Sequence, residues 1–242
     1  MIRGSELRLL NGFELTTDGV PVSFGCAAQR LVAYLALQRR PRSRMLAAAT
    51  LWPEASEERA RANLRSTLWR LRAPCARIVA ADGVRLTLST SVVVDVDELV
   101  IHASALIAGN ADLEAACLLG LDGELLPDWY DDWVLIERER LRQLRLHALE
   151  SVARRRAAQG RYGEACDLAV AALAVDPLRE TAHQLLIELH LAEGNRVEAV
   201  RHYALYRRLL AEKFGLEPTP QMRKLIESVA TASFVPLVAA RT

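Results

Sequence analysis

Apolar and polar residues alternate near the N-terminus, and this period of two predicts short β-strands. Strand character covers Leu7–Leu15 and Val20–Phe24. The residues between them end in Asp18-Gly19, a pair typical of hairpin turns. We therefore expect two opening strands joined by a tight turn.

Three segments further along the chain have the apolar spacing of amphipathic helices. The first is Ala27–Gln38, which a basic linker follows. The second is Arg44–Trp52, with Ser43 as its N-cap and Pro53 as the residue that ends it. The third covers Arg59–Arg72 and begins after a short acidic connection.

A second hairpin is predicted after these helices. Two short apolar runs, Ile78–Val79 and Val84–Leu88, flank the turn segment Ala80–Gly83. Strands, three helices and a closing hairpin in this order are typical of a winged helix-turn-helix, whose third helix enters the major groove of DNA. We expect an α+β N-terminal winged helix-turn-helix domain over residues 1–95.

The C-terminal half contains an internal repeat. Gly160–Ala165 recurs as Gly194–Ala199 at an offset of 34 residues, which is the tetratricopeptide period. Glycine permits the tight turn between paired helices, and alanine lets the partner helix approach closely. A long helix is predicted over Val134–Gln159, and further amphipathic segments cover Leu178–Ala192 and Val197–Phe214. We expect an all-α tetratricopeptide-like helical repeat domain over residues 96–242.

Charge is divided unevenly between these two parts. The 242 residues have a formal net charge of +1, but residues 1–95 hold 14 Lys and Arg against 8 Asp and Glu, while residues 96–242 hold 17 against 22. A basic front and an acidic back indicate different partners. The four cysteines form no C-x-x-C pair, the N-terminus lacks an apolar run of signal-peptide length, and no window approaches the length of a membrane span. We expect a cytoplasmic protein without disulfides, structural zinc or membrane association.

The predicted third helix is apolar on one side and basic on the rest. At about 100° per residue, Ala60, Leu64, Leu68 and Leu71 form one stripe, and five arginines with several small polar groups surround it. Such a helix can bury one side and offer the other to DNA. For this helix taken alone, the alternative is a solvated basic face packed on any small core.

Side-chain chemistry predicts which residues contact DNA. Arg70 is the leading candidate for bidentate pairing with guanine, because its fork matches the O6 and N7 acceptors. Asn63 can address adenine or a phosphate, and Ser66 and Thr67 can make shorter contacts. The arginines expected at the flanks, where contact with the DNA backbone is favoured, are Arg59, Arg65 and Arg72.

Trp69 has two interpretations. Its angular position is outward, where it would contact DNA. Tryptophan is more often half-buried, however, so packing against a neighbouring strand is the favoured interpretation.

A second set of contacts is expected outside the third helix. The basic linker and the N-terminus of the second helix can hold a phosphate, because exposed amides and the helix dipole favour anions there. The residues concerned are Arg42, Ser43 and Arg44, and the candidate contacts of the closing hairpin are Arg85 and Thr87.

No pattern in the chain indicates an enzyme. The five histidines include no H-E-x-x-H or comparable metal-binding spacing, and there is no phosphate-binding glycine loop or G-x-S-x-G motif. His183 and His190 share one helix face, but two ligands without a third do not make a metal site. We expect no catalytic residues, no cofactor and no metal.

Taken together, the motifs resemble the SARP family of bacterial transcriptional activators, which combine an OmpR-type winged helix with a bacterial transcriptional activator domain. The resemblance covers about residues 5–230. The residues that carry it are Leu7–Phe13, Gln29–Leu37, Leu51-Trp52-Pro53, Ala62–Arg65, Trp69–Arg72, Val94–Leu99, Leu125–Trp133 and Phe214–Pro220. The hairpin departs from the family, since Ala80–Gly83 replaces the longer Pro-Gly-containing wing of many members.

The resemblance implies a sequence-specific activator that binds promoter direct repeats as paired copies, as a homodimer on DNA, and recruits RNA polymerase with its sigma factor. Larger relatives carry an ATPase module, and this chain is expected to be too short to hold one. The alternative is a protein-interaction module whose winged helix does not bind DNA and whose acidic repeats dock a partner protein. The arginine face favours the DNA-binding activator, because an interaction module has no need for such a face.

Overall fold

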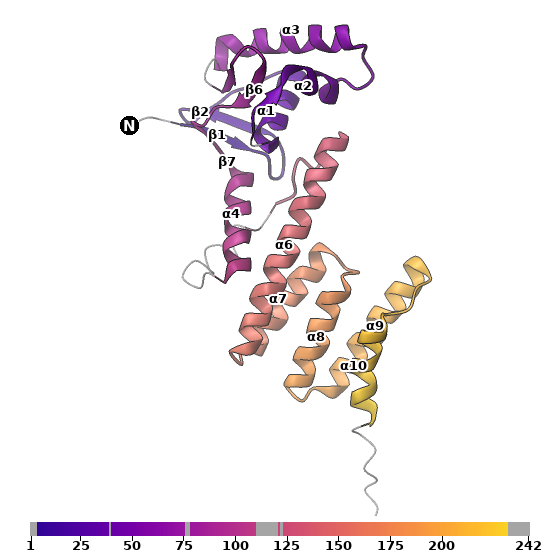
Figure 1. Ribbon diagram of the computed structural model, residues 1–242. Helices are drawn as coiled ribbons and strands as arrows, with labels where there is room; N and C mark the ends of the chain where they lie inside the picture. Colours follow the sequence, from indigo (N-terminus) through magenta and orange to yellow (C-terminus); the bar gives the residue numbers. More distant parts are fainter. Residues whose placement is uncertain (1–3, 39, 76–77, 110–120, 122, 232–242) are drawn as a thin grey trace, which may run out of the picture. The chain divides into compact units, whose positions relative to one another are not determined.

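The computed structural model describes residues 4–38, 40–75, 78–109, 121 and 123–231, without the side chains of residues 72–75 and 228–231 (Figure 1). The chain divides into two compact units. The first comprises residues 1–103 and 115–142, and the second comprises residues 104–114 and 143–242. The domain boundary expected from sequence after residue 95 remains a prediction.

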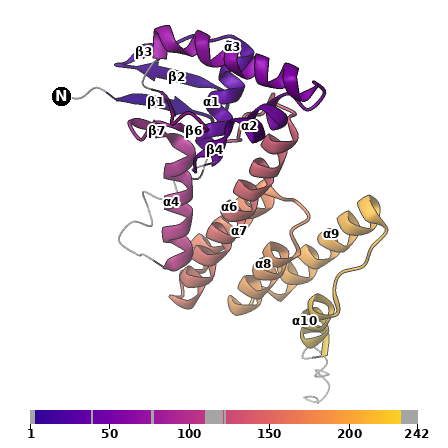
Figure 2. The same ribbon diagram turned by 45° about the horizontal axis from the view of Figure 1, so that its top comes forward.

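A four-stranded sheet forms one side of the first unit, with strand order β3-β2-β1-β7 (Figure 2). Its strands are β1 (Ser5–Arg8), β2 (Glu14–Thr17), β3 (Val20–Pro21) and β7 (Val92–Val94). β1 and β2 are antiparallel with Leu7 opposite Leu15, and both of these leucines are buried. β7, which the sequence pattern did not predict, pairs in parallel with β1.

The single opening strand predicted over Leu7–Leu15 is wrong, because the chain turns inside it. Asn11 and Gly12 have φ values of 65° and 141°, which interrupt the strand and reverse its direction. The predicted turn at Asp18-Gly19 is confirmed, with φ values of 53° and 78°. The N-terminal strands are therefore three instead of two.

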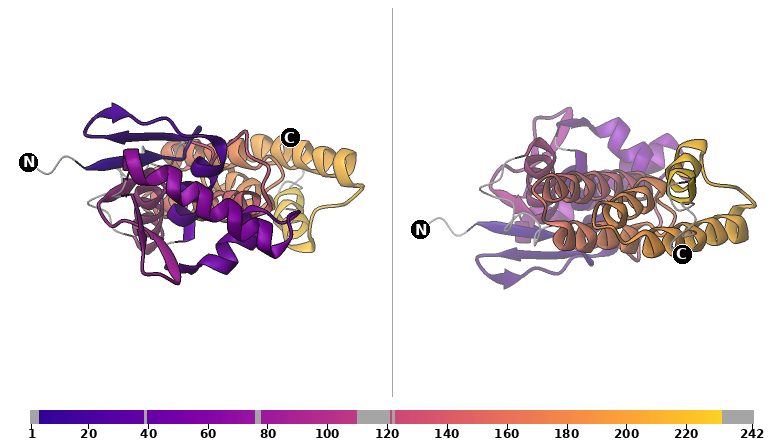
Figure 3. Two further views of the ribbon diagram at one scale, coloured as in Figure 1. Left: turned by 90° about the horizontal axis from the view of Figure 1, so that it is seen from above. Right: turned by 90° about the horizontal axis from the view of Figure 1, so that it is seen from below.

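Three helices follow, as predicted: α1 (Cys26–Gln38), α2 (Arg44–Leu51) and α3 (Glu57–Cys75). Leu31, Val32 and Leu35 of α1 are buried at helical spacing. Ser43 caps α2, because its hydroxyl oxygen accepts a hydrogen bond from the Leu46 amide at 3.1 Å. α3 is the outermost helix of the first unit and runs across its near side in Figure 3, left.

The predicted closing hairpin forms from β5 (Val79–Ala81) and β6 (Arg85–Leu88). Asp82 orders its turn by accepting hydrogen bonds from the amides of Val84 and Arg85, the latter at 2.7 Å. A short strand before α2, β4 (Arg42–Ser43), adds to β6 and gives the sheet order β4-β6-β5. The winged helix-turn-helix fold of the first unit is thus confirmed.

The carboxylate of Asp95 links the N-terminal strands to the next helix, α4 (Asp95–Ala108). It accepts hydrogen bonds from the amides of Leu9 at 3.0 Å, Leu10 at 2.9 Å and Val96 at 2.8 Å. Burial raises the pKa of Asp95, against the lowering effect of these three amides. The carboxylate thus satisfies backbone donors where β1 ends and where α4 begins.

A later segment of the chain returns to the same unit. The Leu126 amide donates to the Leu9 carbonyl at 2.9 Å, and the Arg138 guanidinium donates to the carbonyls of Leu125 at 2.9 Å and Trp129 at 3.0 Å. Trp133 packs edge-on against Tyr34 of α1, with the ring centroids 5.5 Å apart. Residues 123–142 therefore complete the core of the first unit.

The second unit is helical, as predicted. Its helices are α6 (Asp132–Ala158, which begins in the first unit), α7 (Tyr162–Val175), α8 (Glu180–Ala192), α9 (Arg196–Phe214) and α10 (Pro220–Thr231). Gly160 and Gly194 have φ values of 75° and 80° in the turns before α7 and α9, and Ala165 and Ala199 are fully buried. The tetratricopeptide-like repeat is confirmed. Within the described residues, none of the helices is long and apolar enough to cross a membrane.

A buried histidine pair joins α8 to α9. Nε2 of His183 lies 3.0 Å from the Pro177 carbonyl oxygen, so this nitrogen donates, and Nδ1 is left to accept from Nε2 of His202 at 2.9 Å. Burial lowers the pKa of His183 and, together with the nearby His183 and His190 rings, lowers the pKa of His202 to about 4. Both rings are therefore neutral at pH 7, since both pKa values lie below the ordinary value of histidine.

Replacing Asp95 with alanine is expected to destabilise the first unit by about 2–4 kcal/mol, because three amides lose a partly buried charged acceptor. Urea unfolding followed by tryptophan fluorescence measures this unit, since all four tryptophans belong to it. Glu98→Ala, an exposed carboxylate one turn later, is the control and should change stability by less than about 0.5 kcal/mol. Equal effects of the two substitutions would contradict the role given to Asp95.

The histidine pair predicts a loss of stability in mild acid. Unfolded histidines take up protons below about pH 6.5 while the native pair does not, so the unfolded state binds more protons between about pH 6.5 and pH 4. Stability should fall by about 1–2 kcal/mol from pH 7 to pH 5 on account of His202. In thermal unfolding followed by far-UV circular dichroism, His202→Gln should lose this part of the pH dependence. His147→Gln, at an exposed position of α6, should retain it.

Candidate nucleic-acid interface

Four residues of α3 form its buried stripe. Ala60, Leu64, Thr67 and Leu71 each have at most 4% of their surface exposed. They are spaced i, i+4, i+7 and i+11, which places them on one side of a helix. Leu68 is only half-buried, so the stripe is the one expected from sequence except that Thr67 takes the place of Leu68.

The prediction that Thr67 contacts DNA is wrong. Its side chain is 4% exposed, and its hydroxyl donates to the Asn63 carbonyl one turn earlier at 2.8 Å. A threonine hydroxyl satisfied in this way can occupy an otherwise apolar stripe. Thr67 was expected to make a short contact with DNA through the hydroxyl that the helix itself uses.

The middle of the outer face is formed by Arg65, Ser66 and Trp69, which are all exposed. The favoured interpretation of Trp69 as a packed residue is wrong, because 72% of its surface is exposed. Arg59 and Arg70 lie on the flank nearer to the buried stripe and are exposed as well, and Asn63 on that flank is half-buried. An exposed aromatic ring is thus surrounded by guanidinium and hydroxyl groups.

The exposed arginines of this face make no ion pair within the described part of the chain. Arg59, Arg65 and Arg70 have no carboxylate partner there, although Arg61 on the opposite flank pairs with Glu57. Arginines on the helices of the second unit are generally paired, for example Arg161 with Glu164 and Arg201 with Glu198. The outer face of α3 thus carries three arginines without a carboxylate partner among the described residues.

Arg70 lines a small hollow beside the N-terminus of α1. The hollow has a volume of about 230 Å³, and its other lining residues are Thr67 and residues 23–28. Helix N-termini attract anions through their free amides and dipole. A guanidinium group beside such a terminus is suited to contact a phosphate.

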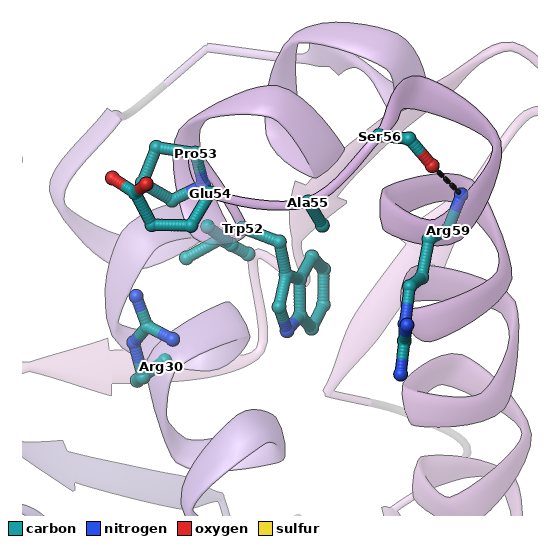
Figure 4. Close-up of a pocket in the computed structure, with 8 residues that line it drawn as sticks. Arg30, Trp52, Pro53, Glu54, Ala55, Ser56 and Arg59 are labelled. Atoms are coloured by element: carbon teal, nitrogen blue, oxygen red, sulfur yellow. Dashed lines mark hydrogen bonds between the residues drawn. The ribbon is translucent and has the colours of Figure 1, made fainter.

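A larger pocket of about 650 Å³ lies at the connection between α2 and α3. In Figure 4 the Trp52 indole lies between the Arg30 side chain from α1 and the Arg59 side chain from α3. Arg30 also pairs with Asp131, and the Ser56 hydroxyl accepts from the Arg59 amide at 3.4 Å. Arg59 was predicted from sequence as a DNA contact, but Arg30 was not. No local sequence pattern indicates that Arg30 lies beside this connection.

The second predicted phosphate site is partly occupied by contacts of the protein itself. Ser43 caps α2 with its hydroxyl and pairs with Arg85 in the β4–β6 ladder. Arg42 donates to Gln38, and both Arg42 and Arg44 are half-buried. Their Nε atoms are buried without a hydrogen-bond partner among the described residues.

The hairpin residues lie at different depths. Arg85 is exposed beside the turn, while Thr87 is half-buried with its hydroxyl 3.3 Å from the Leu88 carbonyl. The side chain of Arg72, the last arginine predicted to contact DNA, lies outside the described residues. Arg85 is therefore the hairpin residue whose charge is available at the surface.

Comparisons with known proteins agree on one class. Residues 101–230 match the family model of the bacterial transcriptional activator domain. The regulatory protein AfsR of Streptomyces coelicolor is 34% identical over 111 residues, which are 46% of this chain and 11% of AfsR. AfsR of Streptomyces griseus is 34% identical over 116 residues, which are 48% of this chain and 12% of that protein. The aligned part thus spans a small fraction of the length of these relatives.

The fold is similar to a solved structure of Mycobacterium tuberculosis EmbR in complex with a low-affinity phosphopeptide. The TM-score is 0.76 at 24% sequence identity, and the similarity covers 95% of this chain and 66% of that chain. A winged helix-turn-helix followed by helical repeats is therefore an arrangement shared with a known structure.

Proposed function

The chain belongs to the bacterial transcriptional activator domain family, and we propose that it acts as a sequence-specific DNA-binding transcriptional activator. Its membership, with the similarity to AfsR, confirms the SARP resemblance found in the motifs. The known relatives are regulatory proteins, which agrees with a regulatory role. The proposal assigns DNA binding to α3 and the hairpin of the first unit.

The observation that carries this proposal is the set of exposed, unpaired arginines on α3. Arg59, Arg65 and Arg70 retain their full charge at the surface, because the described part of the chain offers them no carboxylate. Phosphates are the anions that supply most of the affinity of proteins for DNA. An interaction module docking through its helical repeats would not need this cluster.

The burial pattern supports exchanging the roles of two arginines. Arg65 lies in the middle of the outer face beside Ser66 and Trp69, where a helix in the major groove presents its side chains to base edges. Arg70 lies on the flank, next to the hollow at the N-terminus of α1. We therefore assign base reading to Arg65 and phosphate contact to Arg70, opposite to the expectation from sequence.

Two further elements of the proposal come from the SARP resemblance. Paired copies occupy direct repeats in the promoter, and the bound protein recruits RNA polymerase with its sigma factor.

The two arginine roles predict different binding defects. Arg70→Ala should weaken binding to all duplexes alike and reduce the slope of log K against log salt by about 0.9, the value for one phosphate contact. Arg65→Ala should cost about 1–3 kcal/mol on the preferred site and flatten the preference between sites. Mobility shifts at several salt concentrations, on duplexes selected from a random pool by the unchanged protein, measure both.

Two variants control this experiment. Arg201→Ala removes an exposed arginine of α9 and should leave binding unchanged. Arg70→Lys keeps the charge and should retain most of the affinity if Arg70 contacts phosphate. An unchanged protein that shows no salt-dependent binding to any duplex would favour the interaction module instead.

Trp69 is expected to contact a thymine methyl group in the major groove. Trp69→Ala should weaken binding to the selected duplex by about 1 kcal/mol without lowering stability, because most of the ring is exposed. Replacing thymine with deoxyuracil in the duplex removes the methyl group and should weaken the unchanged protein but not Trp69→Ala. Equal weakening of both proteins by deoxyuracil would contradict this contact.

A further inference from the structure

Three side chains able to bind a metal ion converge between α7 and α8 in the second unit. They are Cys166 of α7, His190 of α8 and Glu193 at the end of α8. One ligand atom from each lies within 4.8 Å of the other two. The expectation of no metal rested on His183 and His190, whereas the fold brings His190 to a different set of ligands.

We propose that Cys166, His190 and Glu193 form a binding site for a divalent transition-metal ion, with Zn²⁺ as the ion that suits it best. Thiolate, imidazole and carboxylate together are the donors of zinc sites. Mg²⁺ and Ca²⁺ prefer oxygen ligands throughout, and a thiol disfavours them. The donor set therefore selects the class of ion.

The geometry needs little adjustment to hold such an ion. Ligand atoms about 2.0–2.3 Å from a tetrahedral zinc ion lie about 3.3–3.8 Å from one another. Side-chain movements of about 1 Å bring the present atoms to that spacing. His190 and Glu193 are three residues apart on one helix face, and Glu193 is exposed at the C-cap of α8. Three protein ligands leave the fourth position to water.

An independent feature of His190 supports the site. Its Nδ1 atom is buried and has no hydrogen-bond partner among the described residues. A buried ring nitrogen without a partner is costly, and the described part of the chain offers no group that satisfies it. A metal ion between the three side chains is a partner that the position can accept.

The thiol of Cys166 fits the same interpretation. Burial raises its pKa, and the negative charges of Glu193 and Asp167, which lie near it, raise the pKa further. A divalent cation reverses the local charge and stabilises the thiolate. Metal binding would then join α7 to the end of α8 and stabilise the helical repeat.

Cobalt titration tests the site directly. The full chain, reduced and freed of metal with a chelator, should bind one Co²⁺ with the thiolate charge-transfer absorption of a cysteine ligand, and Zn²⁺ should displace it. Zn²⁺ should also raise the unfolding temperature. Cys166→Ser should abolish the absorption, and His190→Gln and Glu193→Gln should each weaken binding roughly tenfold or more.

The matched control is Cys26→Ser, which removes an exposed cysteine of the first unit and should leave the cobalt spectrum unchanged. Glu193→Gln keeps the test valid if a core substitution prevents folding, because Glu193 is exposed. The proposal is overturned if the unchanged protein shows no thiolate absorption with Co²⁺, if that absorption survives Cys166→Ser, or if Glu193→Gln binds as tightly as the unchanged protein.

Discussion

The carboxylate of Asp95 is the interaction on which the winged-helix unit depends. Three backbone amides from two distant parts of the chain converge on it, at the end of β1 and at the start of α4. Because β7 ends at Val94, the same residue fixes where the parallel β1–β7 pairing stops. A side chain without an acceptor oxygen in this place would leave these amides unsatisfied, even though burial raises the pKa of Asp95. Within the same unit, α1 contacts α2 and β6 and supports the helix α3.

The position of α3 on that support decides which of its side chains face outward. Replacing Leu68 with Thr67 in the buried stripe turns the outer face by a fraction of the roughly 100° that separates neighbouring residues. This smaller rotation places Arg65 beside Trp69 near the centre and Arg70 toward the flank. A hydroxyl that donates to the preceding turn behaves as an apolar group, which explains why a threonine can take a core position.

Much of the fold could be predicted from the sequence because its signals are local. The cap at Ser43, the Asp18-Gly19 turn, the repeat of Gly160 and Gly194 and the order of the elements each depend on neighbouring residues. The Asn11-Gly12 turn was equally local and was overlooked inside an apolar run. The β1–β7 pairing and the contacts of Asp95 and Arg138 join residues far apart in sequence, and no periodicity indicates them. The cluster of Cys166 and His190 also arises from helix packing and carries no motif.

The distribution of ion pairs explains how a nearly neutral chain can present a strongly basic surface. Exposed ion pairs contribute little to stability, so the arginines paired with glutamates on α6, α7 and α9 serve mainly to neutralise those helices. The arginines on the outer face of α3 are left without such partners in the described part of the chain. Because screening limits electrostatic attraction to about 10 Å, the local charge of α3 matters more to a polyanion than the net charge of +1. Pairing these arginines with carboxylates would preserve the fold but remove the attraction of α3 for a polyanion. Their unpaired state therefore serves the surface of the protein and is not needed by its core.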